Sequence, residues 1–313
     1  LPILIHGAGG TGKTVLMQAV ADHLPSHQHA VIFDGFGAGK WRDPEDGRHL
    51  PNRTLVHLAN LLAGEGLCDL LLPTSDIVGL VAAFRRRLVQ AVGTLRQSDG
   101  KSGVVLILDA IDHAGMEARD TGSRSFAHLI LKSVSIEPID GVTVISSCRT
   151  ERRDLAIGSA TVHQIEVPAF SDDEVRELVL ARDPTATQAE IAALSSRSGR
   201  NPRCLDGFLG AGRPYDGERP GGSDATDSEV LDALLLSRIE SAKNVARSKG
   251  VGEDELNVIL SGLSLLPPPV PLDELAAAHG MDLAAIESFA SDLAPLLERT
   301  PNGLMFRDEP TET

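Results

Sequence analysis

The feature that most constrains the fold is a glycine-rich segment near the start of the chain, GAGGTGKT at residues 7–14. It matches the pattern G-x-x-x-x-G-K-[ST] of phosphate-binding P-loops. The short apolar run before it predicts a core strand, and apolar residues in the following 13–24 segment have helical spacing. A strand, this loop and a helix in that order are the context that the motif requires, and they favour a P-loop over a glycine-rich turn without a ligand.

Each part of the segment has a chemical role in phosphate binding. The glycines allow backbone N–H groups to approach phosphate oxygens, and the helix N-terminus adds its dipole. Lys13 is expected to reach the β- and γ-phosphates, and the Thr14 hydroxyl to ligate Mg²⁺. The residues expected to bind the nucleotide are Gly7, Ala8, Gly9, Gly10, Thr11, Gly12, Lys13, Thr14 and Val15.

A second candidate motif lies at residues 104–112, VVLILDAID. The apolar run 103–109 ends in Asp109 and is typical of a buried parallel strand. Its carboxylate is expected to hold Mg²⁺, which prefers hard oxygen ligands. Asp112 either orients or deprotonates the attacking water, or it is simply the N-cap of a following helix.

A third strand is predicted at residues 142–147, followed by Arg149. A guanidinium at a strand end suits the γ-phosphate because its fork matches phosphate oxygens, although an ordinary surface arginine is the alternative. Arg152 and Arg153 are expected to face solvent. The candidate catalytic residues are therefore Lys13, Asp109, Asp112 and Arg149, and the candidate metal ligands are Thr14 and Asp109.

The pattern of elements predicts three domains. Further strands at residues 30–34 and 161–167 alternate with helices at 53–63, 76–96 and 125–134, which indicates a doubly wound, three-layer α/β/α domain over residues 1–168. Short helices at 171–181, 187–196 and 201–209 then form a small helical lobe over 169–222, and Ser171 with Glu174 reads as a capping box.

A glycine- and proline-rich linker at 211–224 separates these from the third domain, residues 223–313. Helices are predicted there at 226–249, 254–265, 272–279 and 283–297, with a turn at 301–303. Helices followed by a terminal hairpin favour a winged-helix lobe.

The charge of this third domain argues against nucleic-acid binding. The chain has a net charge of −15, of which −11 falls in residues 223–313, with 17 acidic and 6 basic residues. Phosphate contacts need clustered Lys and Arg, and the 283–297 helix carries two acids and no base. Aromatic residues make up only 3% of the chain, too few for a base-stacking platform. A packing or protein-interaction role is expected instead.

Three features of the sequence bear on the cellular compartment of the protein and on whether the chain is complete. The three cysteines are too few and too far apart for a disulfide framework, so a reducing cytoplasm is expected. No apolar run approaches the roughly 18 residues of a membrane helix, so no membrane partner is expected. The chain begins without Met directly at a core strand, and we expect it to be a piece of a longer protein.

A fourth segment, GRNP at residues 199–202, completes an ordered set with GAGGTGKT, LILDAID and VISSCR. In this order the motifs resemble the STAND class of P-loop NTPases, which includes NACHT and NB-ARC modules. The resemblance covers nearly the whole chain. It implies that Pro202 contacts adenine or ribose, and that ATP or ADP with Mg²⁺ controls a slowly hydrolysing switch. It also implies homo-oligomerisation on activation, with an effector domain before Leu1 and a sensor after Thr313.

Segment 33–73 resembles a part of bacterial STAND proteins, including antiviral ones. That makes Trp41, Arg42, Arg48 and His49 candidates for nucleotide or inter-lobe contact, against the alternative of a polar exposed loop. Two other functions stay open, a STAND transcription regulator and an AAA+-type motor.

Two departures from the family pattern matter. Asp112 is followed by His113 where many NACHT modules have a second acid, which disfavours strong hydrolysis and a motor. The terminal stretch also has no histidine that would sense the nucleotide, and only Arg307 is a substitute.

Overall fold

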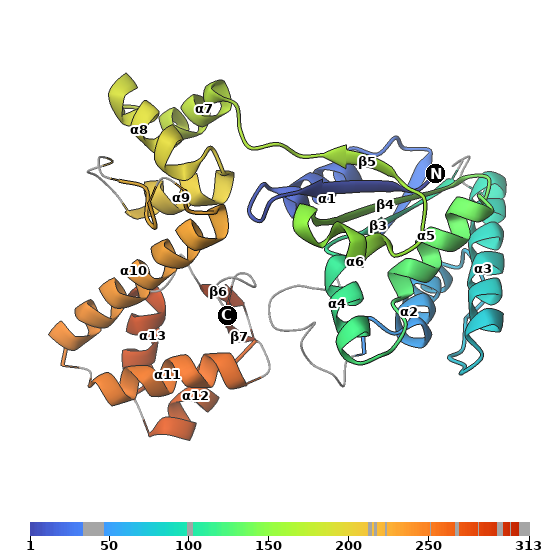
Figure 1. Ribbon diagram of the computed structural model, residues 1–313. Coiled ribbons are helices and arrows are strands. Elements are labelled where there is room, and N and C mark those ends of the chain that lie inside the picture. The colour runs from blue at the N-terminus through green and yellow to red at the C-terminus, as the bar shows by residue number, and fades with distance from the viewer. Residues whose placement is uncertain are drawn as a thin grey trace. The chain divides into compact units, whose positions relative to one another are not determined.

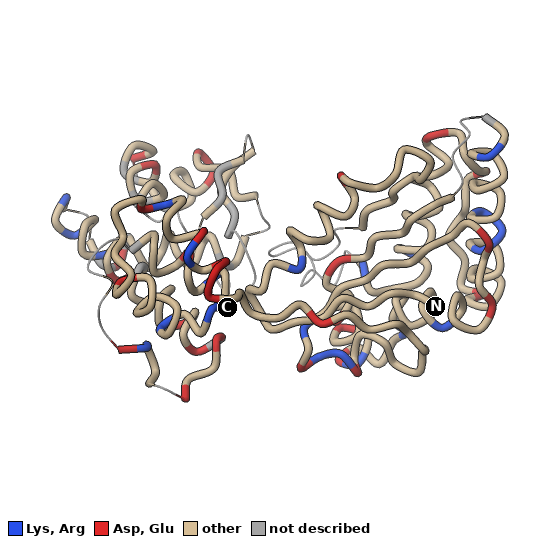
Figure 2. The backbone as a smooth tube through the Cα atoms, turned by 90° about the horizontal axis from the view of Figure 1, so that it is seen from above, with Lys and Arg blue, Asp and Glu red and all other residues tan. Residues whose placement is uncertain are grey.

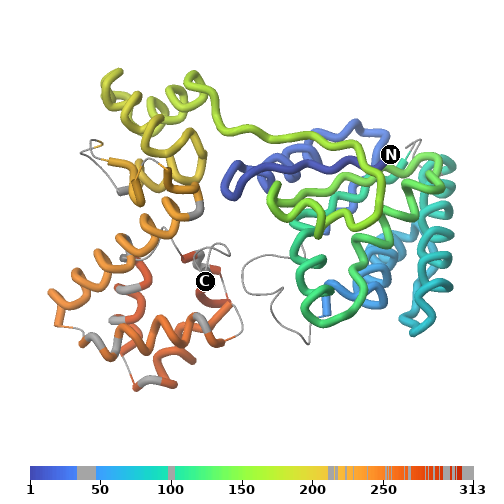
Figure 3. Tube along the Cα trace, viewed as in Figure 1, coloured from blue at the N-terminus to red at the C-terminus, as the bar shows by residue number. Residues whose placement is uncertain are grey.

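The computed structural model describes residues 1–33, 47–98, 103–211, 215, 218–222, 224–250, 252–266, 269–280, 282–292, 297–300 and 302–306. Their contacts divide into two compact units. Unit 1 holds the described residues within 1–8, 12–33 and 47–168, and unit 2 those within 9–11 and 169–306. Figure 3 follows the chain from the blue strand of unit 1 to the yellow and red helices of unit 2.

The centre of unit 1 is a parallel sheet of five strands in the order β2-β3-β4-β1-β5 (Figure 1). The strands are β1 (Ile3–Gly7), β2 (Gln28–Phe33), β3 (Gly103–Leu108), β4 (Val142–Arg149) and β5 (His163–Glu166). All six residues of β3 are buried, as its apolar sequence predicts for a strand covered on both faces.

Helices cover both faces of this sheet. They are α1 (Lys13–Asp22), α2 (Pro51–Gly64), α3 (Ile77–Ser98), α4 (Asp112–Asp120), α5 (Phe126–Ile136) and α6 (Arg153–Ile157), with a 3-10 turn at Thr150–Arg152. On one face, Met17 of α1 packs in a cluster with Ile5, Ile107 and Ile145. Figure 1 shows α2 to α6 on the opposite side. The predicted three-layer α/β/α fold is therefore confirmed.

The strand order sets the position of the candidate residues. Strand β4 lies between β1 and β3, and Gly7 at the end of β1 is in register with Arg149 at the end of β4. Leu108, the last residue of β3, is in register with Ser146. The carboxyl ends of these three parallel strands therefore meet at one edge of the sheet.

Unit 2 is helical, with a terminal antiparallel hairpin. Its elements are α7 (Asp172–Arg182), α8 (Gln188–Ser198), α9 (Pro202–Ala211), α10 (Asp227–Ser248), α11 (Glu253–Leu265), α12 (Leu272–His279), α13 (Leu283–Asp292), β6 (Leu297–Thr300) and β7 (Gly303–Phe306). The predicted capping box of Ser171 and Glu174 is present, and equivalent boxes begin α8 and α10. Val270 bridges to Leu304 beside the hairpin.

Helix α10 is shared by two apolar cores of unit 2. Near its start, Val230 and Leu231 pack in a cluster with α7, α8 and α9. Further along, Ala242 and Ala246 pack in a second cluster with α11, α12, α13 and the hairpin. One continuous helix therefore joins the two cores.

Three details differ from the sequence-based expectations. Helix α6 was not predicted, and the helix after Asp112, which was given only as an alternative, is α4; both are short. The last predicted helix was too long, since α13 ends at Asp292 and Leu297 already begins β6.

Figure 2 shows acidic and basic residues interspersed along the backbone of both units. No helix in the described part of the chain combines the length and the apolar character needed to cross a membrane.

Candidate functional site

The glycine-rich loop turns through backbone conformations that favour glycine. Gly10 has φ +79° and Gly12 has φ +86°, both in the left-handed region. Gly12 is the N-cap of α1, and its carbonyl accepts the Leu16 N–H at 2.9 Å. Because the first N–H groups of a helix have no partner within the helix, the start of α1 offers donors to an anion. Thr14 and Val15 are exposed there.

The ammonium group of Lys13 lies on the loop that precedes it. Its Nζ donates to the carbonyl oxygens of Gly7 at 2.9 Å and Ala8 at 2.8 Å. Burial lowers the pKa of Lys13, while the nearby charge of Asp112 opposes that shift and the charge of Arg149 adds to it. Asp112 and Arg149 are thus charged neighbours of Lys13.

Asp109 follows β3 and is held by a neighbouring strand. Asp109 is buried, and its Oδ1 accepts a hydrogen bond from the Ser147 hydroxyl of β4. The same hydroxyl accepts the Ala110 N–H at 2.9 Å. Ala110 itself has φ +52°, which is unusual for a residue with a side chain. Ser147 therefore fixes both the carboxylate and the strained turn after it, a role that the sequence did not indicate.

Asp112 is the first residue of α4, one position later than the N-cap that was the alternative interpretation. Its side chain is only 1% exposed, and Oδ2 lies 3.8 Å from Nη1 of Arg152. Burial raises the pKa of Asp112, and the charges of His113 and Arg152 partly counteract this. The expectation that Arg152 faces solvent was wrong, since its side chain is 22% exposed and reaches this carboxylate.

Arg149 ends β4 beside the first residue of the loop, as the Gly7–Arg149 register requires. The residue after it, Thr150, hydrogen-bonds through Oγ1 to Nδ1 of the buried His6 at 3.1 Å. His6 directly precedes the loop, so this contact ties the turn after β4 to the end of β1.

The oxygen atoms at this edge of the sheet are of the kind that magnesium binds. A Mg²⁺ ion takes hard oxygen ligands and keeps several waters, with one or two protein groups and the phosphates of its nucleotide. The exposed Thr14 hydroxyl and the Asp109 carboxylate supply such oxygens. No group of three His, Cys, Asp or Glu side chains in the described residues is arranged to hold a metal by itself.

The GRNP segment begins α9, with Pro202 half-buried at the first position of the helix. The Arg203 N–H donates to the carbonyl of Gly10 at 3.3 Å, within unit 2. Asn201, which the sequence analysis did not single out, is fully buried.

The remaining candidates lie elsewhere or outside the description. His49 is buried near α4 and α5, where its carbonyl accepts the Phe126 N–H at 2.9 Å. The carbonyl of Arg48 accepts a hydrogen bond from the Thr54 hydroxyl. Trp41, Arg42 and Arg307 lie outside the described residues.

Comparison with known proteins identifies the first part of the chain. Residues 1–183 match the sequence model of the NACHT domain. No curated protein matches the chain significantly.

Among solved structures, the chain is similar to a Signal Transduction ATPase with Numerous Domains (STAND) with a tetratricopeptide repeat sensor from Pyrococcus horikoshii. The two are 15% identical with a TM-score of 0.53, and the match covers 99% of this chain and 39% of that one. The chain thus spans about two fifths of that protein's length, and at this identity the similarity concerns the fold alone.

Two other matches are weaker. The Thermotoga maritima RuvB Holliday junction branch migration motor is 16% identical with a TM-score of 0.31, covering 97% of this chain and 84% of that one. Drosophila ORC bound to DNA is 14% identical with a TM-score of 0.39, covering 95% and 81%. TM-scores this low do not indicate a common fold.

Proposed function

The chain belongs to the NACHT family of STAND-class P-loop NTPases, and we propose that it is the nucleotide-binding switch module of a larger signalling protein. ATP and ADP are its two ligands, and Mg²⁺ accompanies them. One observation carries this proposal: Lys13 donates to the carbonyl of Gly7, and Gly7 is in register with Arg149 at the edge where β1, β3 and β4 end.

Each candidate residue has a role in this proposal. The loop of residues 7–15 wraps the phosphates, and Lys13 exchanges the carbonyls of Gly7 and Ala8 for the β- and γ-phosphate oxygens. Thr14 and Asp109 hold the Mg²⁺ ion, which neutralises phosphate charge. Arg149 pairs with the γ-phosphate through its guanidinium fork.

Hydrolysis is slow in this proposal. Asp112 in its ionised form accepts a hydrogen bond from the attacking water and orients it. A single carboxylate that is buried and whose pKa is raised by that burial is ionised less completely than an exposed one. Its neighbour His113 stands where a second acid would strengthen the base.

The switch follows from the difference between the two nucleotides. ATP adds a γ-phosphate that Lys13, Arg149 and the metal contact, and a ligand shifts a conformational equilibrium only through such a differential interaction. We infer three domains, at 1–168, 169–222 and 223–313. The last is a winged-helix lobe with a packing role, supported by the order α11, α12, α13 and the β6–β7 hairpin. Homo-oligomerisation in the ATP state, an effector and a sensor outside the chain, and an antiviral role complete the proposal.

The experiment is a comparison of nucleotide states in the natural protein. MgATP is expected to raise the molar mass measured by light scattering above that with MgADP, and Lys13→Ala is expected to abolish the response. An unchanged mass and unchanged hydrogen exchange at saturating MgATP in the wild-type protein would contradict the switch.

A further inference from the structure

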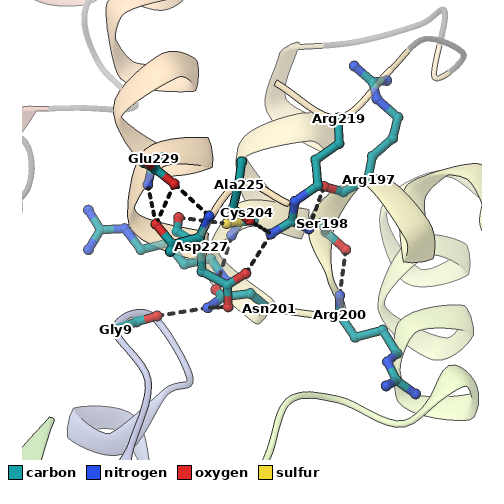
Figure 4. Close-up of polar contacts among 12 residues, drawn as sticks. Gly9, Arg197, Ser198, Arg200, Asn201, Cys204, Arg219, Ala225, Asp227 and Glu229 are labelled. Carbon is teal, nitrogen blue, oxygen red and sulfur yellow. Dashed lines mark hydrogen bonds and ion pairs between the residues drawn. The ribbon is translucent and has the colours of Figure 1, made fainter. Parts of the chain in front are cut away.

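Gly9, in the middle of the phosphate-binding loop, belongs to unit 2, and its carbonyl oxygen has a buried partner in the same unit. Nδ2 of Asn201 donates to it at 2.7 Å (Figure 4). The same nitrogen donates its second hydrogen to Oδ2 of Asp227 at 3.0 Å. Asn201 is fully buried, so water does not compete for either hydrogen bond.

The other side of the Asn201 amide is also occupied. Oδ1 accepts the N–H of Arg203 at 3.0 Å and that of Cys204 at 3.3 Å, which makes Asn201 the N-cap of α9. These four contacts fix the orientation of the amide. A flipped amide would place its oxygen against the Gly9 carbonyl and the Asp227 carboxylate, both of which only accept hydrogen bonds.

Asp227 is held from its other side by Arg219. Its Oδ1 accepts from Nη2 of Arg219 at 2.7 Å. The Arg219 guanidinium also donates to the carbonyls of Arg197 at 3.1 Å and Ala225 at 3.2 Å (Figure 4). Asp227 is the first residue of α10, so this network joins the loop to the helix that both cores of unit 2 share.

The next residue of the loop fits the same surface closely. A Cβ atom at Gly10 would lie 2.8 Å from Cβ of Arg203 and 2.8 Å from Oδ1 of Asn201. The start of α9 therefore contacts the loop through both the Gly9 and the Gly10 peptides. In both contacts the loop contributes a carbonyl oxygen, which accepts the hydrogen bond.

We propose that Asn201 is a positioning residue for the phosphate-binding loop, and that its pairing with Asp227 couples occupancy of the loop to α10. This inference rests on the proposed nucleotide binding and specifies its regulation. Asn201 fixes the Gly9 peptide before the ligand arrives, which lowers the cost of ordering the loop. Because coupling between two sites is reciprocal, a nucleotide that orders the loop also stabilises the first turn of α10.

Asn201→Asp isolates the bond to Gly9. A carboxylate still accepts the N–H groups of Arg203 and Cys204 and keeps the cap of α9. It has no hydrogen to donate to the Gly9 carbonyl, and it faces Asp227 as a like charge. Affinity for MgADP, measured by isothermal titration calorimetry on the full chain, is expected to fall at least tenfold.

The swapped pair Asn201→Asp with Asp227→Asn separates positioning from stability. The new amide at 227 donates to the new carboxylate at 201 and still accepts from Arg219. The unfolding midpoint is therefore expected to return to within about 2 °C of wild type. The bond to Gly9 is not restored, so MgADP affinity is expected to stay at least tenfold weakened. Asp227→Asn alone keeps that bond and is the matched control, with affinity within threefold of wild type.

The coupling to α10 has its own measurement. In the wild-type chain, MgADP is expected to slow hydrogen exchange in the first two turns of α10, and in the swapped pair this protection is expected to disappear at MgADP saturation. Wild-type affinity in the swapped pair, or equal protection of α10 in both proteins, would overturn the inference. If the wild-type chain itself does not bind MgADP, the proposed function fails rather than this inference.

Discussion

The carboxylate of Asp112 lies 3.8 Å from the guanidinium of Arg152. Asp112 follows β3 and Arg152 follows β4, which lies beside β3 in the sheet. Burial raises the pKa of Asp112, and the positive charge of Arg152 is one of the influences that lower it. The ionisation of the proposed water-orienting group therefore depends on an arginine that contacts it, and that dependence is measurable.

Arg152→Gln is expected to move the acidic limb of ATP hydrolysis to higher pH. Hydrolysis requires the ionised carboxylate, so activity is lost as pH falls through the raised pKa of Asp112. Removing Arg152 raises that pKa further. The measurement is kcat against pH under saturating MgATP. Arg96→Gln removes an exposed arginine that pairs with Asp140 and serves as the control with an unchanged profile. If the acidic limb of the Arg152→Gln profile lies at the same pH as in wild type, Arg152 does not control the ionisation of Asp112.

Asp112→Asn is expected to lower kcat about 100-fold, because the neutral amide no longer accepts the proton or orients the water as a base does. It is also expected to change the pH dependence of stability. A carboxyl group whose pKa is raised on folding stabilises the fold fully below its ordinary pKa of 3.8 and loses that contribution as pH rises through the raised value.

The free energy of unfolding of Asp112→Asn, relative to wild type, should therefore increase between pH 4 and pH 7. This increase is expected to be about 1.4 kcal/mol for each unit by which burial raises the pKa of Asp112. Urea unfolding at several pH values measures it. If the difference in unfolding free energy between Asp112→Asn and wild type is constant across this range, burial does not raise the pKa of Asp112.

Asp109→Asn is expected to weaken the dependence of ATP binding and hydrolysis on Mg²⁺. The amide keeps the size of the side chain and still accepts the Ser147 hydroxyl, but it is a poorer ligand for a hard cation. A magnesium titration of hydrolysis should shift to at least tenfold higher concentration. Unchanged magnesium dependence would remove Asp109 from the proposed metal site.

Two glycines of the loop allow a matched comparison of stability. Gly10 and Gly12 both have positive φ, so alanine costs about 1–2 kcal/mol at either position. Only at Gly10 does the new Cβ meet Arg203 and Asn201, whereas at Gly12 nothing lies within 4 Å. Gly10→Ala is therefore expected to be destabilised by at least about 1 kcal/mol more than Gly12→Ala in chemical unfolding. Equal costs would mean that the contact with α9 does not persist in solution.

Much of the fold is predictable from the sequence because its patterns are local. The glycine-rich loop and the wholly apolar β3 indicate a parallel sheet with the loop at its edge, and the structure confirms this. Ser171 and Glu174 likewise predict the start of α7, since a capping box involves only neighbouring residues.

Contacts between distant residues are not predictable in this way. The bond from Asn201 to Gly9 joins residues 192 positions apart, and Arg152 reaches Asp112 from another element. Ser147 supports Asp109 only because β4 lies beside β3. These contacts depend on the order of the strands in the sheet and on the packing of α9 against the loop. The spacing of apolar residues in the sequence predicts neither of these.

The most direct test of the account is nucleotide binding by the wild-type chain and by Lys13→Ala. The Lys13 ammonium is expected to contribute charge-assisted hydrogen bonds of about 2 kcal/mol, so MgATP affinity should fall at least about 30-fold in the variant. Lys132→Ala, which removes an exposed lysine of α5, should bind like wild type. Isothermal titration calorimetry of all three proteins decides the matter. Equal MgATP affinity in wild type and Lys13→Ala, or no binding by the wild-type chain, would contradict the assignment of this loop as the nucleotide site.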